Sequence, residues 1–126
     1  MSDRIIQTKK APAAIGPYSQ AVLAGGFLYT SGQLGLDPET GVLPETIEDQ
    51  TAQSLRNIQA FLEEAGFRKT DVVKTVVYLK DLSDFAVVNG IYAGFFGGHK
   101  PARSCVEVSR LPKGGLIEIE VVAHRV

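Results

Sequence analysis

Residues 72–108 contain a strand, a helix and a second strand in succession. The run VVKTVVYL, residues 72–79, is β-branched and largely apolar, which is typical of an interior strand. Apolar residues then recur at helical spacing up to a Gly-Gly pair, which predicts a helix of about a dozen residues capped by Asp81 or Ser83. A strand over 103–108 completes the unit. We expect the two strands to be parallel and joined by a right-handed crossover.

The first half of the chain predicts a β-hairpin and another amphipathic helix. Two apolar runs flank Gly25-Gly26, a dipeptide that supplies the positive φ angles of a tight turn, so residues 20–31 are predicted to form the hairpin. The Gly- and Pro-rich segment that follows is predicted to be a loop. Thr46 then begins a Ser/Thr-x-x-acid capping pattern, apolar residues recur at helical spacing, and Gly66 is the expected end of the helix.

The last strand alternates apolar and acidic residues. In residues 117–121 the isoleucines and the valine form one row, and Glu118 and Glu120 form the other. This strand follows the turn LPKGG and is expected to run antiparallel to the strand before it. Together the elements predict the α+β class: a mixed sheet packed against two helices on one face, in a single domain that spans residues 1–126.

Polar residues gather on the strands that are predicted to come last. Arg103, Cys105 and Glu107 occupy alternate positions and therefore share one side of their strand. We expect this side, with Glu118 and Glu120, to form the sheet face that the helices leave uncovered. One interpretation is a solvated face with weak cross-strand ion pairs. The other is an anion site, in which the arginine binds a carboxylate bidentately and a glutamate positions water or moves protons.

Composition disfavours several classes of protein. The chain has 14 acidic and 13 basic residues, a net charge of −1, and no dense Lys/Arg cluster, so it is a poor candidate to bind nucleic acid or an anionic membrane. No apolar run approaches the length that spans a bilayer, and the first residues lack the apolar core of a secretory signal. We therefore expect a cytoplasmic protein.

Few side chains suit metal binding or covalent catalysis. Cys105 is the one cysteine, so no intramolecular disulfide is possible, and His99 and His124 lack metal-ligand spacing. An inert, buried thiol is one interpretation of Cys105, and a pair with His99 is the alternative. The segment GFFGGHKP lacks the spacing of a phosphate loop and is interpreted as a helix stop. The sequence predicts neither a metal nor a cofactor.

Five motifs occur in order along nearly the whole chain. They are IGPYSQAV (15–22), SGQLG (31–35), KDLSDFAVVN (80–89), PARSCVEV (101–108) and LPKGGLIEIE (111–120). Together they resemble the motifs of the reactive intermediate deaminase family of the RidA type, also called YjgF-like. The resemblance implies a fold like that of chorismate mutase and a homotrimer with active sites in the clefts between subunits. It also implies hydrolysis of 2-iminoacids, chiefly 2-iminobutanoate and 2-iminopropanoate, to 2-oxoacids and ammonia without a cofactor.

The same resemblance implies roles for individual residues. Arg103 matches the arginine that binds the substrate carboxylate, Glu118 the acid that orients or activates water, and Tyr18 the aromatic residue that closes the pocket. Further matches line the pocket, namely Ser31, Gly32, Asn89 and Cys105. Alternatives remain open: an endoribonuclease or translation inhibitor, which the net charge disfavours, a non-catalytic metabolite-binding trimer, and a holdase-type chaperone.

Overall fold

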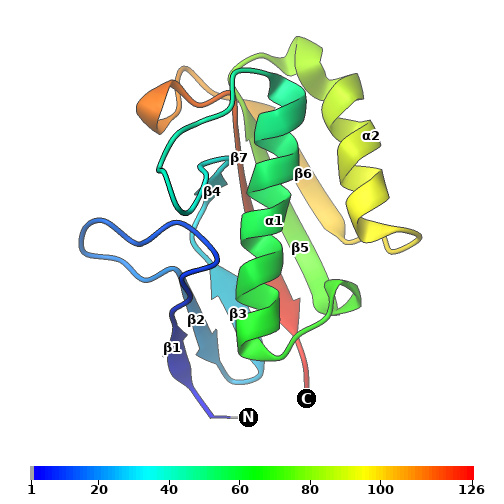
Figure 1. Ribbon diagram of the computed structural model, residues 1–126. Coiled ribbons are helices and arrows are strands. Elements are labelled where there is room, and N and C mark those ends of the chain that lie inside the picture. The colour runs from blue at the N-terminus through cyan, green and yellow to red at the C-terminus, as the bar shows by residue number, and fades with distance from the viewer. Residues whose placement is uncertain (1) are drawn as a thin grey trace.

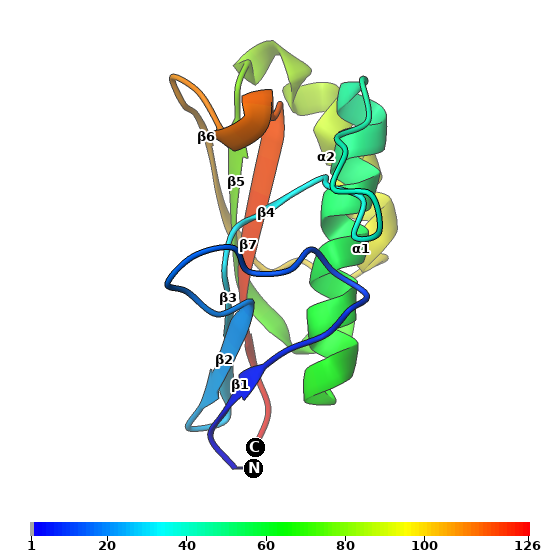
Figure 2. The same ribbon diagram turned by 60° about the vertical axis from the view of Figure 1, so that its left-hand side comes forward.

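A computed structural model describes residues 2–126 of the chain as an α+β structure (Figure 1). Seven strands form one mixed sheet in the order β1-β2-β3-β7-β5-β6, and the short β4 pairs with β7. Both α-helices lie side by side on the same face of this sheet (Figure 2). The predicted class and the layer of two helices are therefore confirmed. Neither helix in residues 2–126 has the length and apolar character needed to cross a membrane.

The elements have the following bounds. The strands are β1 (Arg4–Ile6), β2 (Ala21–Ala24), β3 (Phe27–Thr30), β4 (Gln33–Leu34), β5 (Val72–Leu79), β6 (Ala102–Glu107) and β7 (Ile117–His124). The α-helices are α1 (Ile47–Ala65) and α2 (Phe85–Phe96), and three short 3₁₀ turns are η1 (Lys69–Asp71), η2 (Leu82–Asp84) and η3 (Pro112–Gly114).

The helix α1 begins and ends where local chemistry predicts. The Thr46 hydroxyl accepts a 3.1 Å hydrogen bond from the Asp49 N–H, which satisfies one of the free donors of the first turn. At the other end Gly66 has a φ of 79°, the left-handed conformation that glycine adopts most readily. Both boundaries depend on residues within one turn of the helix end, which is why the sequence alone could place them.

The parallel pairing of β5 and β6 and the helix between them are also confirmed, with one difference at the start of the helix. Asp81 caps η2 rather than α2, because its carboxylate accepts a 2.9 Å hydrogen bond from the Ser83 N–H. The helix α2 then runs to Gly97, which has a φ of 64° and ends it. The chain returns to β6, which pairs in parallel with β5.

The first hairpin is confirmed, and two short strands were not predicted. β2 and β3 pair antiparallel around Gly25 and Gly26, whose φ angles are 58° and 80°. The segment predicted as a loop contains β4, in which Gln33 pairs with Ile119 of β7. The N-terminal segment contributes β1. Strands of two and three residues are too short to display an alternating pattern, so they could not be predicted from the sequence.

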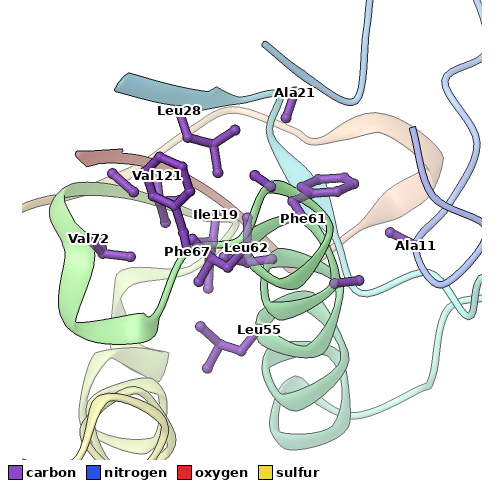
Figure 3. Close-up of a cluster of buried hydrophobic side chains, with 14 of the residues drawn as sticks. Ala11, Ala21, Leu28, Leu55, Phe61, Leu62, Phe67, Val72, Ile119 and Val121 are labelled. Carbon is purple, nitrogen blue, oxygen red and sulfur yellow. The ribbon is translucent and has the colours of Figure 1, made fainter. Parts of the chain in front are cut away.

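The core lies between α1 and the sheet (Figure 3). Leu55, Phe61 and Leu62 of α1 are almost fully buried, as are Ile119 and Val121 of β7. Each such side chain contributes about 1.5–3 kcal/mol through its removal from water. The apolar row of β7 therefore faces α1, and the residues that alternate with this row point to the opposite side of the sheet.

The predicted grouping of the polar residues on one sheet face is wrong. Arg103 pairs with Thr75 of β5, and Thr75 pairs with Val121 of β7. Residues that lie opposite each other on adjacent strands point to the same side, so Arg103 and its row lie on the face that the helices cover. Glu118 and Glu120 alternate with the buried row of β7 and lie on the uncovered face.

The predicted ion pairs between these rows are wrong for a second reason. β5 lies between β6 and β7 in the sheet, so Arg103 is not a cross-strand neighbour of either glutamate. Alternation fixes the two sides of each strand, but the relation between two strands depends on sheet order and register, which the sequence pattern did not contain. Glu107, the last member of the arginine row, instead accepts a 2.9 Å hydrogen bond from the Leu82 N–H.

Candidate active site

Arg103, on the edge strand β6, is held by one face of α2. Its Nη1 donates a 2.7 Å hydrogen bond to Oδ1 of Asn89. The guanidinium carbon lies 4.9 Å from the ring centre of Tyr92 and 5.3 Å from that of Phe85. Residues 85, 89 and 92 have the i, i+4, i+7 spacing of a single helix face. The helix thus orients the guanidinium through one amide and two aromatic rings.

Tyr92 is held in place by a residue of the sheet. Its hydroxyl shares a 2.7 Å hydrogen bond with the Thr75 hydroxyl, and Thr75 is the cross-strand neighbour of Arg103 in β5. Both side chains are buried. The arginine is therefore placed by a closed set of contacts among β5, β6 and α2.

The guanidinium of Arg103 has no carboxylate counter-ion within residues 2–126. The one ion pair closer than 4.0 Å in this part of the chain joins Arg68 and Asp71. The amide and the two rings around Arg103 are neutral groups, although the rings do stabilise its charge. A planar, charged donor with neutral neighbours is suited to bind an external carboxylate through two parallel hydrogen bonds.

Cys105 lies two residues along β6, on the same side as Arg103, and packs against the core. Burial raises the pKa of the Cys105 thiol, and the nearby Arg103 charge opposes this effect without overcoming it. His99, the alternative partner in the sequence, instead has its Nε2 2.7 Å from the Val72 carbonyl oxygen. The thiol is therefore protonated at neutral pH and is not arranged as a nucleophile.

Glu118 lines a cavity of about 580 Å³ that Tyr18, Gly32 and Lys113 also line. Burial raises the pKa of the Glu118 carboxyl, and the charge of Glu120 raises it further. A carboxylate whose pKa is raised toward neutrality accepts a proton more readily than an ordinary glutamate. The cavity thus contains a base with room for water beside it.

Gly32 allows Glu118 to lie against the backbone. A Cβ at this position would be 2.8 Å from Cδ of Glu118, closer than real Cβ atoms approach a neighbour, and 3.0 Å from Cγ, which is also unusually close. The residue connects β3 to β4, at the wall of the same cavity. Any side chain here would displace the glutamate.

The loop that carries Tyr18 is tied to the body of the molecule by Gln20. The buried Gln20 side chain accepts a 2.8 Å hydrogen bond from the Thr8 N–H and donates a 3.0 Å bond to the Thr8 carbonyl. The Ser31 hydroxyl donates a 2.6 Å bond to the carbonyl of Ser19, the neighbour of Tyr18. Ser31 therefore supports the position of the tyrosine loop.

The residues predicted for the site fall into two groups on opposite faces of the sheet. Tyr18, Gly32 and Glu118 share the cavity, and Ser31 adjoins it. Arg103, Asn89 and Cys105 form the second group, on the side of α2. A single chain does not bring the two groups together.

Sequence reasoning missed three residues of these groups. Phe85 and Tyr92 were predicted only as part of the apolar stripe of α2, although their spacing from Asn89 could have shown that all three share a face. Lys113 lines the Glu118 cavity with a φ of 58°, a left-handed conformation that is uncommon outside glycine. The signal in the sequence was the position of Lys113 in the Gly-rich turn PKGG, where a left-handed conformation is common.

A larger cavity of about 670 Å³ lies along the N-terminal segment. Lys9, Lys10 and Glu64 line it, and it shares Tyr18 with the smaller cavity, but neither Arg103 nor Glu118 reaches it. Of these two cavities, the smaller one is lined by Glu118, whose carboxyl group has a raised pKa.

Comparisons with known proteins give a consistent family. Residues 8–125 match the sequence model of the family described as Endoribonuclease L-PSP. A 2-iminobutanoate/2-iminopropanoate deaminase of Salmonella typhimurium is 53% identical over 125 residues, which cover 97% of this chain and 98% of that protein. The structure of the YjgF gene product from E. coli has a TM-score of 0.94 and 51% identity, covering 98% of this chain and 99% of that one.

A further solved structure, E. coli TdcF with bound serine, has a TM-score of 0.94 and 45% identity, covering 98% of this chain and 99% of that one. The chain is thus similar to these proteins in both sequence and fold, which confirms the family that the five motifs predicted. The chain therefore belongs to the endoribonuclease L-PSP family and is of its RidA type, also called YjgF-like.

Proposed function

We propose that this protein is a deaminase that hydrolyses 2-iminoacids such as 2-iminobutanoate and 2-iminopropanoate to 2-oxoacids and ammonia. The observation that carries the proposal is the Arg103 guanidinium, which is oriented by neutral groups and has no counter-ion within residues 2–126. A relative with 53% identity bears the name of this activity. Another, with 45% identity, binds serine, which has the same α-carboxylate as the proposed substrates.

The reaction needs orientation, a placed water molecule and a proton acceptor. In the proposed mechanism Arg103 binds the substrate carboxylate, and Glu118 positions the water. The water oxygen attacks the imine carbon as Glu118 accepts its proton, so that C=N becomes a single bond in a carbinolamine. Glu118 returns that proton to the nitrogen, the C–N bond breaks with loss of ammonia, and the hydroxyl group gives its proton to the freed Glu118 carboxylate as C=O forms. The protonated imine and water thus yield the 2-oxoacid, ammonia and one proton.

The remaining residues shape the pocket in this proposal. Tyr18 closes it, Ser31 and Gly32 form its wall, and the backbone near Cys105 contacts the substrate. Asn89 acts on the substrate through Arg103, whose guanidinium it holds. An imine carbon, already electrophilic, does not require a covalent nucleophile, which agrees with the protonated state of the Cys105 thiol.

We further propose that each site forms between two subunits of a homotrimer. Arg103 and Glu118 lie on opposite faces of one sheet, so a substrate that contacts both must receive one of them from a second chain. The uncovered sheet face supports this arrangement, because it exposes large apolar side chains: Ile5, Val22, Phe27, Tyr29 and Val106, each 38–60% accessible. Exposed apolar surface of this extent is typical of an interface. The number of subunits follows from the family resemblance.

The test couples the protein to a threonine dehydratase or an amino-acid oxidase and traps free imine with semicarbazide. Parent and Arg103→Ala are compared, with Arg56→Ala, on the exposed surface of α1, as the matched control. We expect the parent and the control to form 2-oxoacid in competition with the trap, and Arg103→Ala to lose this ability while keeping its fold. Equal rates for the parent and Arg103→Ala would remove the arginine from the site. If the parent failed to compete with the trap, the deaminase proposal would be wrong.

A further inference from the structure

Glu118 has a second carboxylate beside it on the uncovered sheet face. Glu120 lies two residues along β7 and points to the same side. From the adjacent strand β5, Tyr78 is the direct cross-strand partner of Glu118. Its hydroxyl nevertheless donates a 2.6 Å hydrogen bond to Oε1 of Glu120. The two carboxylates therefore differ in their hydrogen bonding, because the phenol donates to Glu120 and not to Glu118.

This hydrogen bond holds the Glu120 carboxylate beside Glu118. A negative charge held next to a second carboxyl group makes that second group the better proton acceptor. The bond to Glu120 raises the pKa of Tyr78 to about 12, so the phenol remains a donor throughout the physiological range. Glu118, by contrast, is half-buried, and both burial and the charge of Glu120 raise its pKa.

We propose that Tyr78 and Glu120 are positioning residues that prepare Glu118 as the proton acceptor. Tyr78 holds the Glu120 carboxylate in place beside Glu118, and the charge of Glu120 strengthens Glu118 as the group that takes a proton from water. The proton moves from water to Glu118 and then to the leaving nitrogen. This inference rests on the proposed deaminase function.

Other titratable groups face Glu118 from the walls of its cavity. They are Tyr18 from the loop before β2, Asp37 and Glu39 from the loop after β4, and Lys113 from η3. Hydrogen bonds from the backbone of Thr40 and of Glu39 lower the pKa of Asp37, so its charge is constant where Glu118 titrates. These groups, and an Arg103 supplied by a neighbouring chain, are common to the parent and every variant below.

Two variants of the pair and one control test the proposal in the assembled protein. Glu120→Gln removes the charge, Tyr78→Phe removes the donor, and the control Glu63→Gln removes a charge from the exposed surface of the last turn of α1. The first measurement is a pH titration of the Glu118 carboxyl carbon by ¹³C NMR, with the signal assigned by its loss in Glu118→Gln. The second is the acidic limb of the pH profile of kcat/KM.

The direction of each shift follows from the role of Glu118 as a base. Its carboxylate form is active, so activity falls as the pH drops through the raised pKa. Two like charges about 7 Å apart near a protein surface interact strongly enough to move a midpoint by about one pH unit. We expect Glu120→Gln to lower the Glu118 midpoint and the acidic limb by this amount. Tyr78→Phe should produce a smaller shift in the same direction, and Glu63→Gln none.

The outcomes separate this inference from the function on which it rests. An unchanged Glu118 midpoint in Glu120→Gln would overturn the inference, even if that variant were slower. If Glu120→Gln did not assemble, Tyr78→Phe would decide, because it removes only a hydroxyl, and an unshifted midpoint there would overturn the proposal. The third outcome is that Glu120→Gln shifts the Glu118 midpoint but the parent does not hydrolyse imines. This result would refute the deaminase function and leave the coupling of the two carboxylates intact.

Discussion

The substitution Gly32→Ala should separate the position of Glu118 from the stability of the fold. Gly32 is not among the glycines of positive φ, so alanine can adopt its backbone conformation without strain. The added Cβ would be 2.8 Å from Cδ of Glu118, whereas an ordinary contact begins at 3.4 Å, so the carboxyl group must retreat by at least 0.6 Å. The obstacle is the end of a flexible side chain rather than backbone, and the side chain can move without disturbing the sheet.

This displacement has different consequences for activity and stability. A catalytic group misplaced by about 1 Å can cost about 100-fold in rate, so we expect kcat/KM for imine hydrolysis to fall about 10- to 100-fold. Glycine-to-alanine changes at compatible positions stabilise a protein by about 0.4–1 kcal/mol through the unfolded state, which offsets the cost of moving Glu118. The free energy of unfolding should therefore change by less than about 1 kcal/mol.

The assay is the trapping experiment described above, with urea unfolding measured on the same samples. Gly94→Ala is the matched control, because a Cβ at that position of α2 would meet no atom within 4 Å. It should retain parental activity and gain up to about 1 kcal/mol of stability from its helix propensity. Full activity in Gly32→Ala would show that the observed position of Glu118 is not the one used in catalysis. A strongly destabilised variant would contradict the assumption that only the side chain moves.

Two other substitutions test the arginine side of the site. Asn89→Ala removes the acceptor that holds Nη1 of Arg103, and we expect KM to rise about tenfold, the equivalent of one charge-assisted hydrogen bond, with a smaller effect on kcat. An unchanged KM in steady-state kinetics would mean that the two rings suffice to orient the guanidinium. Cys105→Ser should retain most of the activity, because the thiol is protonated and only the backbone near it contacts the substrate. Complete loss of turnover, with the Tm preserved, would restore a chemical role for the sulfur.

The parts of the fold that the sequence predicted correctly depend on local chemistry. Thr46 and Gly66 mark the ends of α1 through contacts within one turn, and the alternation in β7 identifies its buried row. The family was predictable because five motifs keep their order along the chain. These signals depend on residues that are close together in the chain, so they can be recognised in the amino-acid sequence alone.

The arrangement of the site could not be predicted in the same way. Whether Arg103 and Glu118 share a face depends on β5 lying between their strands and on the register of both pairings. The hydrogen bond of Tyr78 to Glu120 joins residues 42 positions apart and runs diagonally across two strands. Contacts of this kind arise from the whole sheet, and a pattern within one strand does not contain them.

The separation of Arg103 and Glu118 on opposite sheet faces has a genetic consequence. In the proposed assembly every chain serves two sites, giving its arginine to one and its glutamate to the other. A chain with a defective arginine therefore still provides a working glutamate to a neighbour. Two inactive alleles, Arg103→Ala and Glu118→Gln, would complement each other when expressed together, because some sites in the mixed assemblies would combine both intact halves.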